Sequence, residues 1–227
     1  MKDHLILLAS KSPRRRELLA GLGIPFRVVD VNADENYPSE LREGDIPLFI
    51  ARSKAAAYAE PLAEGEVLLT ADTIVWLDGE VLGKPKDEGD AVRMLHRLSG
   101  KTHQVYTAVC LRFRCGAPMN NVKWGESGVS ANNVPPTCRD SIILPSLSDN
   151  NTIGERAFVS RSDVTFRTLS DEEIYHYVRH YRPLDKAGAY GIQEWIGYIG
   201  CVKMEGSFYN VMGLPTAALY DELKKIL

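Results

Sequence analysis

The chain has 227 residues, of which 44% are hydrophobic and 25% charged, and its formal net charge is −3. A chain of this length and composition can bury an adequate core, as one large domain or two small ones. A general nucleic-acid-binding surface is not indicated, because such surfaces carry a basic excess.

The first predicted element is a buried strand, Leu5–Ala9, which runs into the turn Ser10–Pro13 and three consecutive arginines. We expect Ser12 to be the N-cap of a helix that begins at Pro13 and ends near Leu22. A helix N-terminus already carries partial positive charge, so arginines such as Arg14 are unfavourable there unless an anion docks against them. The strand, turn and cationic helix start therefore predict an anion site, most often one for phosphate.

A second strand is expected over residues 26–31, followed by an acidic turn and a helix from Ile46 to Glu60 capped by Asp45. Val67–Thr70 is predicted to be a short buried strand that ends just before Asp72. Open α/β sheets place ligand-binding residues at strand ends, so Asp72 is a candidate cation ligand or general base. Capping of the next turn is an equally good interpretation of this residue.

The turn signal Asp78-Gly79 predicts a two-residue hairpin between strands at 74–77 and 80–82. Further along, a helix capped by Asp87 and ending at Leu98 is expected, then strands at 104–113 and 163–169. A capping box at Ser170 predicts a helix to about His180, and a last helix is expected over 215–227. The alternation of strands and helices predicts an α/β fold.

The segment from Arg114 to Arg156 interrupts the alternation of predicted strands and helices. It is rich in Asn, Ser, Pro and Gly, and it is long for a loop of a compact domain. We expect a surface insertion at about 114–156 in a single domain covering 1–227.

The four cysteines lack zinc-site spacing and are expected to be reduced thiols, although a disulfide between Cys115 and Cys138 remains an open alternative. The short apolar run before Lys11 predicts neither a signal peptide nor a membrane span, and hence a cytoplasmic protein.

Two lysines stand out. Lys54 shares a helix face with apolar neighbours, so it is either a lysine at the edge of the core or a phosphate ligand placed by a rigid helix. Lys84, in Gly79–Pro85, superficially resembles a phosphate-binding loop, but Pro85 stands where a magnesium-binding Ser or Thr is needed. We interpret Lys84 as a lysine presented after a hairpin.

Taken together, the candidates are cationic groups and carboxylates without a nucleophile. Glu35 is a weak candidate alone, but with Asp72 it would complete an oxygen-ligand site of the kind magnesium shares with substrate phosphates. The isolated histidines, His96, His103 and His176, are expected to be structural. This inventory predicts metal-assisted attack of water on a phosphoanhydride.

Seven short stretches, in order along nearly the whole chain, resemble the Maf family of nucleoside triphosphate pyrophosphatases. They are Leu7–Arg15, Ala51–Ala55, Ala71–Val75, Gly83–Pro85, Leu98–His103, Asp185–Gln193 and Val211–Pro215. The resemblance implies a mixed, elongated central sheet with helices on both sides, as in inosine triphosphatases, and a cleft between two lobes. It also implies a homodimer.

The same resemblance implies residue roles. Asp72 would accept the proton of the attacking water and lie near a divalent metal, Mg²⁺ or Mn²⁺, held also by Glu35. The phosphates would be held by Ser10, Arg14, Lys54 and Lys84. The specificity positions are occupied by Arg14, Thr73 and Gln193, a combination similar to the subgroup that acts on dTTP and UTP. Glu194 follows Gln193 where a glycine is common in the family.

The implied function is hydrolysis of dTTP and UTP to the nucleoside monophosphate and pyrophosphate, with modified pyrimidine nucleotides as further candidate substrates. The expected partner is a nucleoside triphosphate; neither nucleic acid nor a membrane is expected. The alternative is a nucleotide-binding regulatory protein of cell division or septum formation without significant turnover. Presence of both carboxylates beside the cationic residues favours the enzyme, because binding an anion needs no acid that holds metal.

Overall fold

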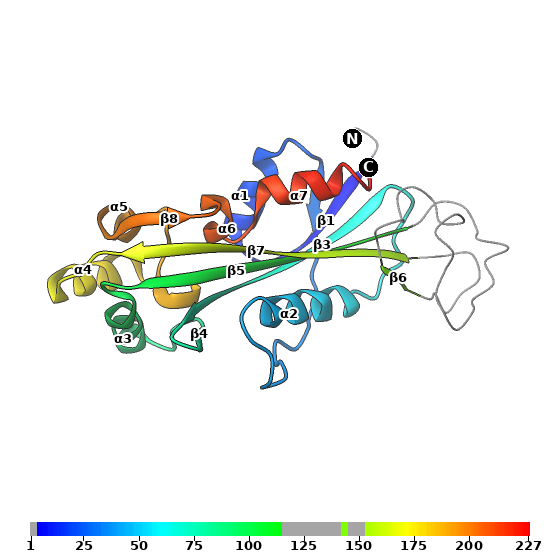
Figure 1. Cartoon of the computed structure of the whole chain (residues 1–227). Coiled ribbons are helices and arrows are strands. Elements are labelled where there is room, and N and C mark those ends of the chain that lie inside the picture. Colours follow the sequence, from blue (N-terminus) through cyan, green and yellow to red (C-terminus); the bar gives the residue numbers. More distant parts are fainter. Residues whose placement is uncertain (1–3, 115–141, 145–152) are drawn as a thin grey trace.

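The structure, a computed structural model, describes residues 4–114, 142–144 and 153–227. Within these ranges, strands form one mixed sheet in the order β2-β1-β3-β5-β7-β6, with β4 beside β3 and β8 beside β7 (Figure 1). β1 pairs in parallel with β2 and β3, and the other pairs are antiparallel. The strands are β1 (Leu5–Ala9), β2 (Phe26–Val28), β3 (Glu66–Leu77), β4 (Glu80–Leu82), β5 (Thr102–Arg114), β6 (Ile142–Leu144), β7 (Ile153–Phe166) and β8 (Cys201–Glu205).

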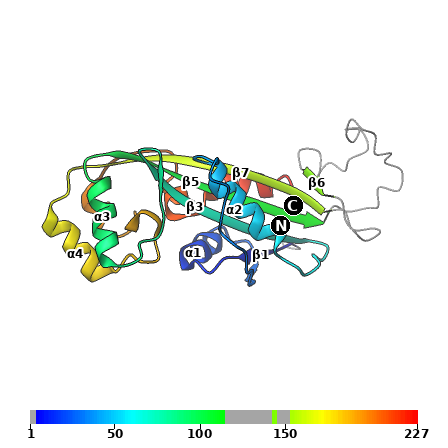
Figure 2. The ribbon, with the colours of Figure 1, turned by 90° about the horizontal axis from the view of Figure 1, so that it is seen from below.

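Helices cover both faces of this elongated sheet, which confirms the predicted α/β class. α1 and α7 lie on one face and α2 on the other (Figure 1), while α3 and α4 gather at one end of the molecule (Figure 2). The helices are α1 (Pro13–Gly21), α2 (Asp45–Ala56), α3 (Glu88–Leu98), α4 (Asp171–Tyr181), α5 (Trp195–Gly200), α6 (Phe208–Met212) and α7 (Thr216–Leu223), with a short 3-10 turn, η3, at Ala187–Ala189.

The alternation of side chains along β3 builds the core on both faces. Leu69 packs on the α1 and α7 side with Leu19 and Leu219, whereas Leu68 packs on the α2 side with Ala51. This is the period of two that a strand covered on both faces requires. A separate apolar cluster, formed by residues from α3, α4, α5 and the far halves of β3, β5 and β7, makes the core of the second lobe.

One edge of β3 has a gap between two neighbours. The pairing with β1 ends at Ala9 and Thr70, and the pairing with β4 begins only at Val75. On the opposite edge β5 pairs with β3 continuously from Val67 to Trp76. Residues 71–74 of β3 therefore have no strand partner on one edge, while pairing with β5 holds the other edge rigidly.

The structure corrects several predicted boundaries. Asp72 does not follow a strand end, because pairing with β5 carries β3 through it to Leu77. Asp45 is the first residue of α2 rather than its cap; Gly44 occupies the cap position and the helix ends at Ala56, not Glu60. β2 ends at Val28 instead of 31. β7 begins at Ile153, ten residues before the expected strand, because its first half also pairs with β5.

Part of the 114–156 segment lies in strands: Arg114 ends β5, 142–144 form β6, and 153–156 open β7. The remainder, with Cys115 and Cys138, lies outside the described residues. Cys110 and Cys201 are free thiols, as expected for these two. Among the helices of the described ranges, none combines the length and the apolar character that crossing a bilayer requires.

Candidate active site

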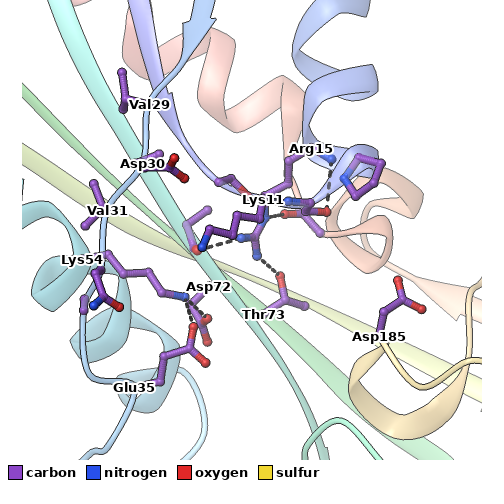
Figure 3. Close-up of a pocket in the computed structure, with 18 of the residues that line it drawn as sticks. Lys11, Arg15, Val29, Asp30, Val31, Glu35, Lys54, Asp72, Thr73 and Asp185 are labelled. Atoms are coloured by element: carbon purple, nitrogen blue, oxygen red, sulfur yellow. Dashed lines mark hydrogen bonds and ion pairs between the residues drawn. The ribbon is translucent and has the colours of Figure 1, made fainter.

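A pocket of about 490 Å³ opens at the gap in the sheet, between the carboxyl end of β1 and the unpaired edge of β3 (Figure 3). Because β1 ends there, side chains from both faces of β3 reach the same cavity: Asp72 points toward α2 and Thr73 toward α1. The polar residues that line it are Ser10, Lys11, Ser12, Arg15, Asp30, Asn32, Glu35, Lys54, Asp72, Thr73, Lys84 and Asp185.

The β1–α1 turn forms one wall, as the sequence predicted. Ser12 is the N-cap of α1, its hydroxyl accepts a hydrogen bond from the backbone N–H of Arg15, and Pro13 follows at the first helical position. The Ser10 hydroxyl in turn accepts from the N–H of Ser12 at 3.2 Å. These contacts fix the turn at the start of a helix, where free N–H groups and the helix dipole favour an anion.

Lys54 joins two carboxylates on the opposite wall. Its ammonium lies 2.7 Å from Asp72 Oδ1 and 2.7 Å from Glu35 Oε1 (Figure 3). Only 16% of the Lys54 side chain and 14% of the Asp72 side chain are exposed, whereas Glu35 is 57% exposed. The hydrogen bond from Lys54 lowers the pKa of Glu35, which keeps that carboxylate charged. Lys54 is thus a charged member of the site, held by the helix α2.

Arg15, rather than Arg14, is the arginine inside the pocket. Its guanidinium donates to the carbonyl oxygens of Ala71 and Gly213, each at 2.8 Å, and to the Thr73 hydroxyl at 3.0 Å. Burial lowers its pKa. No carboxylate among the described residues lies within ion-pair distance of it, although Asp72 and Glu35 act on its charge from further away. The sequence showed three adjacent arginines, and nothing local distinguished the one whose acceptors lie on β3 and after α6.

Six of the eight expected site residues line the pocket together: Ser10, Glu35, Lys54, Asp72, Thr73 and Lys84. Arg14 and Gln193 do not line it. Arg14 instead forms a 3.0 Å ion pair with Asp185, which does line the pocket and which the sequence analysis did not single out. Gln193 is half-buried two residues before α5.

His103 is a structural residue, as expected. It is buried against Tyr190, and burial lowers its pKa to about 4.

The chemistry of the donor set fits a divalent cation shared with a substrate. Glu35 and Asp72 direct hard carboxylate oxygens to one point, which the Lys54 ammonium occupies. Across the described ranges no group of three or more His, Cys, Asp or Glu side chains is placed to hold a metal by itself. Mg²⁺ commonly uses one or two carboxylates and completes its shell with substrate phosphates and water. The pair therefore suits a metal that arrives with an anionic ligand.

Several known proteins are similar to this chain over its full length. Over the full chain, the sequence is 47% identical to a protein named dTTP/UTP pyrophosphatase from Bacteroides thetaiotaomicron, 98% of which is covered. It is 45% identical, over 99% of the chain and 95% of the relative, to a protein of the same name from Porphyromonas gingivalis strain W83.

Among solved structures, a nucleoside-triphosphatase (dITP/XTP pyrophosphatase) from Mycobacterium abscessus overlaps 71% of this chain and 74% of its own, at 16% identity and a TM-score of 0.33. That likeness is too slight to carry any argument. The family match is extensive, by contrast: residues 5–137 and 141–226 fit the family described as Maf-like protein, including most of the 114–156 segment. The chain belongs to the Maf-like protein family.

Proposed function

We propose that this chain hydrolyses dTTP and UTP between the α and β phosphates, releasing the nucleoside monophosphate and pyrophosphate. Relatives at 45–47% identity over nearly the whole chain carry the name dTTP/UTP pyrophosphatase, which supports this substrate class. The observation that carries the proposal is the Lys54 ammonium bridging Asp72 and Glu35 beside a cationic helix start. Such a site can both bind phosphates and supply a base.

The proposed reaction uses Asp72 as the proton acceptor. The water oxygen adds to the α phosphorus, the bridging oxygen leaves with pyrophosphate, and the carboxylate of Asp72 takes the proton of the water. Asp72 is suited to this role because the rigid β3–β5 pairing fixes its backbone while its side chain lies at the open gap. Ser10, Lys54 and Lys84 would hold the phosphates from three separate elements.

The divalent cation, Mg²⁺ or Mn²⁺, belongs to the proposal as well. Glu35 and Asp72 would hold it with phosphate oxygens; when bound, the cation would neutralise charge on the triphosphate.

Arg14, Thr73 and Gln193 are proposed to select the nucleobase of the substrate. For Thr73 the support is its place on the pocket wall; for Arg14 it is the contact with Asp185 at the pocket; for Gln193 it is the family resemblance alone. Assembly as a homodimer likewise rests on that resemblance.

The test is pyrophosphate release from a panel of dTTP, UTP, CTP, dGTP, ATP and 7-methyl-GTP with Mg²⁺ or Mn²⁺. Metal-dependent release from dTTP and UTP, well above the other nucleotides, is the expected result. Preference for a nucleotide with another nucleobase would leave the proposed reaction in place but contradict the specificity role of Arg14, Thr73 and Gln193. Absence of turnover by the folded protein on every member of the panel would overturn the proposal and favour a regulatory nucleotide-binding role.

A further inference from the structure

The second lobe reaches the pocket through residues 185–194, the segment between α4 and α5. Asp185 lines the pocket, and the N–H of Gly188 donates to the carbonyl of Gly83, next to Lys84, at 3.0 Å. Gly188 has a φ of +68°, and a Cβ there would lie 2.9 Å from Val75 Cγ2, so only glycine permits this close approach. The segment is therefore seated firmly against the β3–β4 hairpin.

A chain of alternating charges runs along this segment to the pocket. Arg14 Nη1 lies 3.0 Å from Asp185 Oδ2, and Asp185 Oδ1 lies 2.7 Å from Lys186 Nζ. Lys186 Nζ also lies 3.1 Å from Glu194 Oε1, and the other oxygen of Glu194 accepts a hydrogen bond from the Tyr177 hydroxyl. We call the series Arg14–Asp185–Lys186–Glu194 the charge relay.

The two ends of the charge relay differ: Glu194 is held in place by neighbouring groups, whereas Asp185 is exposed. The Lys186 side chain is 9% exposed, and a buried ammonium needs a charged partner to stay there. Glu194 is held by Tyr177, whose oxygen also accepts from the N–H of Gly191 at 3.0 Å. Asp185, by contrast, is 58% exposed at the pocket. Its partial burial opposes ionisation, but the hydrogen bonds from Lys186 and Arg14 outweigh this and lower its pKa.

We propose that Glu194 is a positioning residue, which through Lys186 and Asp185 holds Arg14 beside the pocket wall and so tightens the binding of nucleoside triphosphates. The inference rests on the proposed function for the role of the pocket. Glu194 shares the charge of Lys186 with Asp185. Without that negative charge, the buried ammonium would draw the carboxylate of Asp185 inward, and Arg14 would lose its fixed orientation.

The experiment compares Glu194→Gln with wild type in two assays: KM and kcat for UTP, and the Kd of α,β-methylene-UTP, which resists hydrolysis. Glu194→Gln keeps the size of the side chain and its acceptor for Tyr177 but removes the charge. We expect KM and Kd to rise about fivefold, with kcat within about twofold, the effect of weakening one partly exposed ion pair. Glu194→Asp, which restores the charge, should recover most of the affinity.

Glu173→Gln is the matched control. Glu173 pairs with Arg167 at 2.7 Å in the same lobe and does not line the pocket. Glutamine preserves its capping box, so Kd should stay at the wild-type value. If Glu194→Gln proves poorly folded, Asp185→Asn breaks the relay at an exposed residue and should give the same rise in Kd.

The Arg14→Ala background separates positioning from a purely structural role. If Glu194 acts through Arg14, Glu194→Gln adds no further change in Kd once Arg14 is removed. A full fivefold increase in that background, or an unchanged Kd in both Glu194→Gln and Asp185→Asn, would overturn the inference. A wild-type protein that binds the analogue without hydrolysing UTP would overturn the proposed function and leave the relay to stand on its Kd values. A wild-type protein that does not bind the analogue would overturn both.

Discussion

The ammonium of Lys54 lies 2.7 Å from the carboxylate of Asp72, although the two residues come from different elements, α2 and β3. The contact is possible because Thr70 and Asp72 face α2 on alternate positions of β3: the Thr70 hydroxyl donates to the carbonyl of Ala51, one turn before Lys54, at 2.7 Å. A rigid helix thereby places a cation at the open edge of a rigid strand.

Replacement of Lys54 by Met tests whether this cation serves binding or the core. Met keeps the apolar stem, but it leaves the charges of Glu35 and Asp72 facing each other and removes a phosphate partner. We expect the Kd of α,β-methylene-UTP to rise about tenfold or more, with a melting temperature within about 3 °C of wild type. Lys101→Met, at an exposed pair with Asp78, is the control. A large loss of thermal stability with unchanged Kd would instead support the interpretation of Lys54 as a core-edge lysine.

Removal of divalent metal with a chelator should stop pyrophosphate release, and added Mg²⁺ should restore it. Glu35→Gln should raise the Mg²⁺ concentration for half-maximal rate by about tenfold, because one of two carboxylates is lost. Asp34→Asn serves as the comparison, since Asp34 is exposed, hydrogen-bonded to Asn36 and not part of the pocket wall. An identical Mg²⁺ requirement in Glu35→Gln and wild type would remove Glu35 from the metal site.

Arg15→Lys should destabilise the fold as well as the site. Lysine cannot reproduce the three directed hydrogen bonds of the guanidinium, so the buried carbonyls of Ala71 and Gly213 would lose partners. We expect a loss of about 2 kcal/mol, or a melting temperature lower by about 4–8 °C, measured by thermal unfolding. Arg16→Lys, its exposed neighbour, should change the melting temperature little. Equal values for the two variants would show that the Arg15 contacts contribute nothing.

The His103 environment predicts a stability change below neutral pH. Burial lowers the pKa of His103 from 6.5 to about 4, so between these values the unfolded chain binds the proton that the folded chain excludes. Its contribution is fully present above pH 6.5 and falls by up to about 3 kcal/mol as the pH drops toward 4. Denaturant unfolding at several pH values measures this. His103→Gln should flatten the curve in that window, and an unchanged slope would contradict the assignment.

Local signals in the sequence were sufficient to predict the β1–α1 turn, which forms one wall of the pocket. Ser12, Pro13 and the apolar run before them predicted the strand, cap and helix of the β1–α1 turn, because capping and strand burial depend on adjacent residues. The hairpin at Asp78-Gly79 and the capping box at Ser170 were predicted for the same reason.

Features that depend on distant pairing were not predictable in this way. The polar residues Asp72 and Thr73 looked like the end of a strand, but β5, more than thirty residues later, continues the pairing through both. Which of the adjacent arginines enters the pocket depends on acceptors at Ala71 and Gly213, far along the chain. Asp185 stood inside a recognised stretch, yet only the fold brings it to Arg14.

The central claim, that Asp72 supplies the base at the gap in the sheet, is tested most directly by Asp72→Asn. The measurement is pyrophosphate release from UTP beside the Kd of α,β-methylene-UTP in the same preparation. Asp78→Asn is the control, since Asp78 lies exposed just beyond the same strand with a φ of +53° that asparagine tolerates.

We predict that Asp72→Asn lowers kcat about a hundredfold or more while Kd stays within about threefold, as loss of a general base requires. Turnover at the wild-type rate by a folded Asp72→Asn protein would contradict the account.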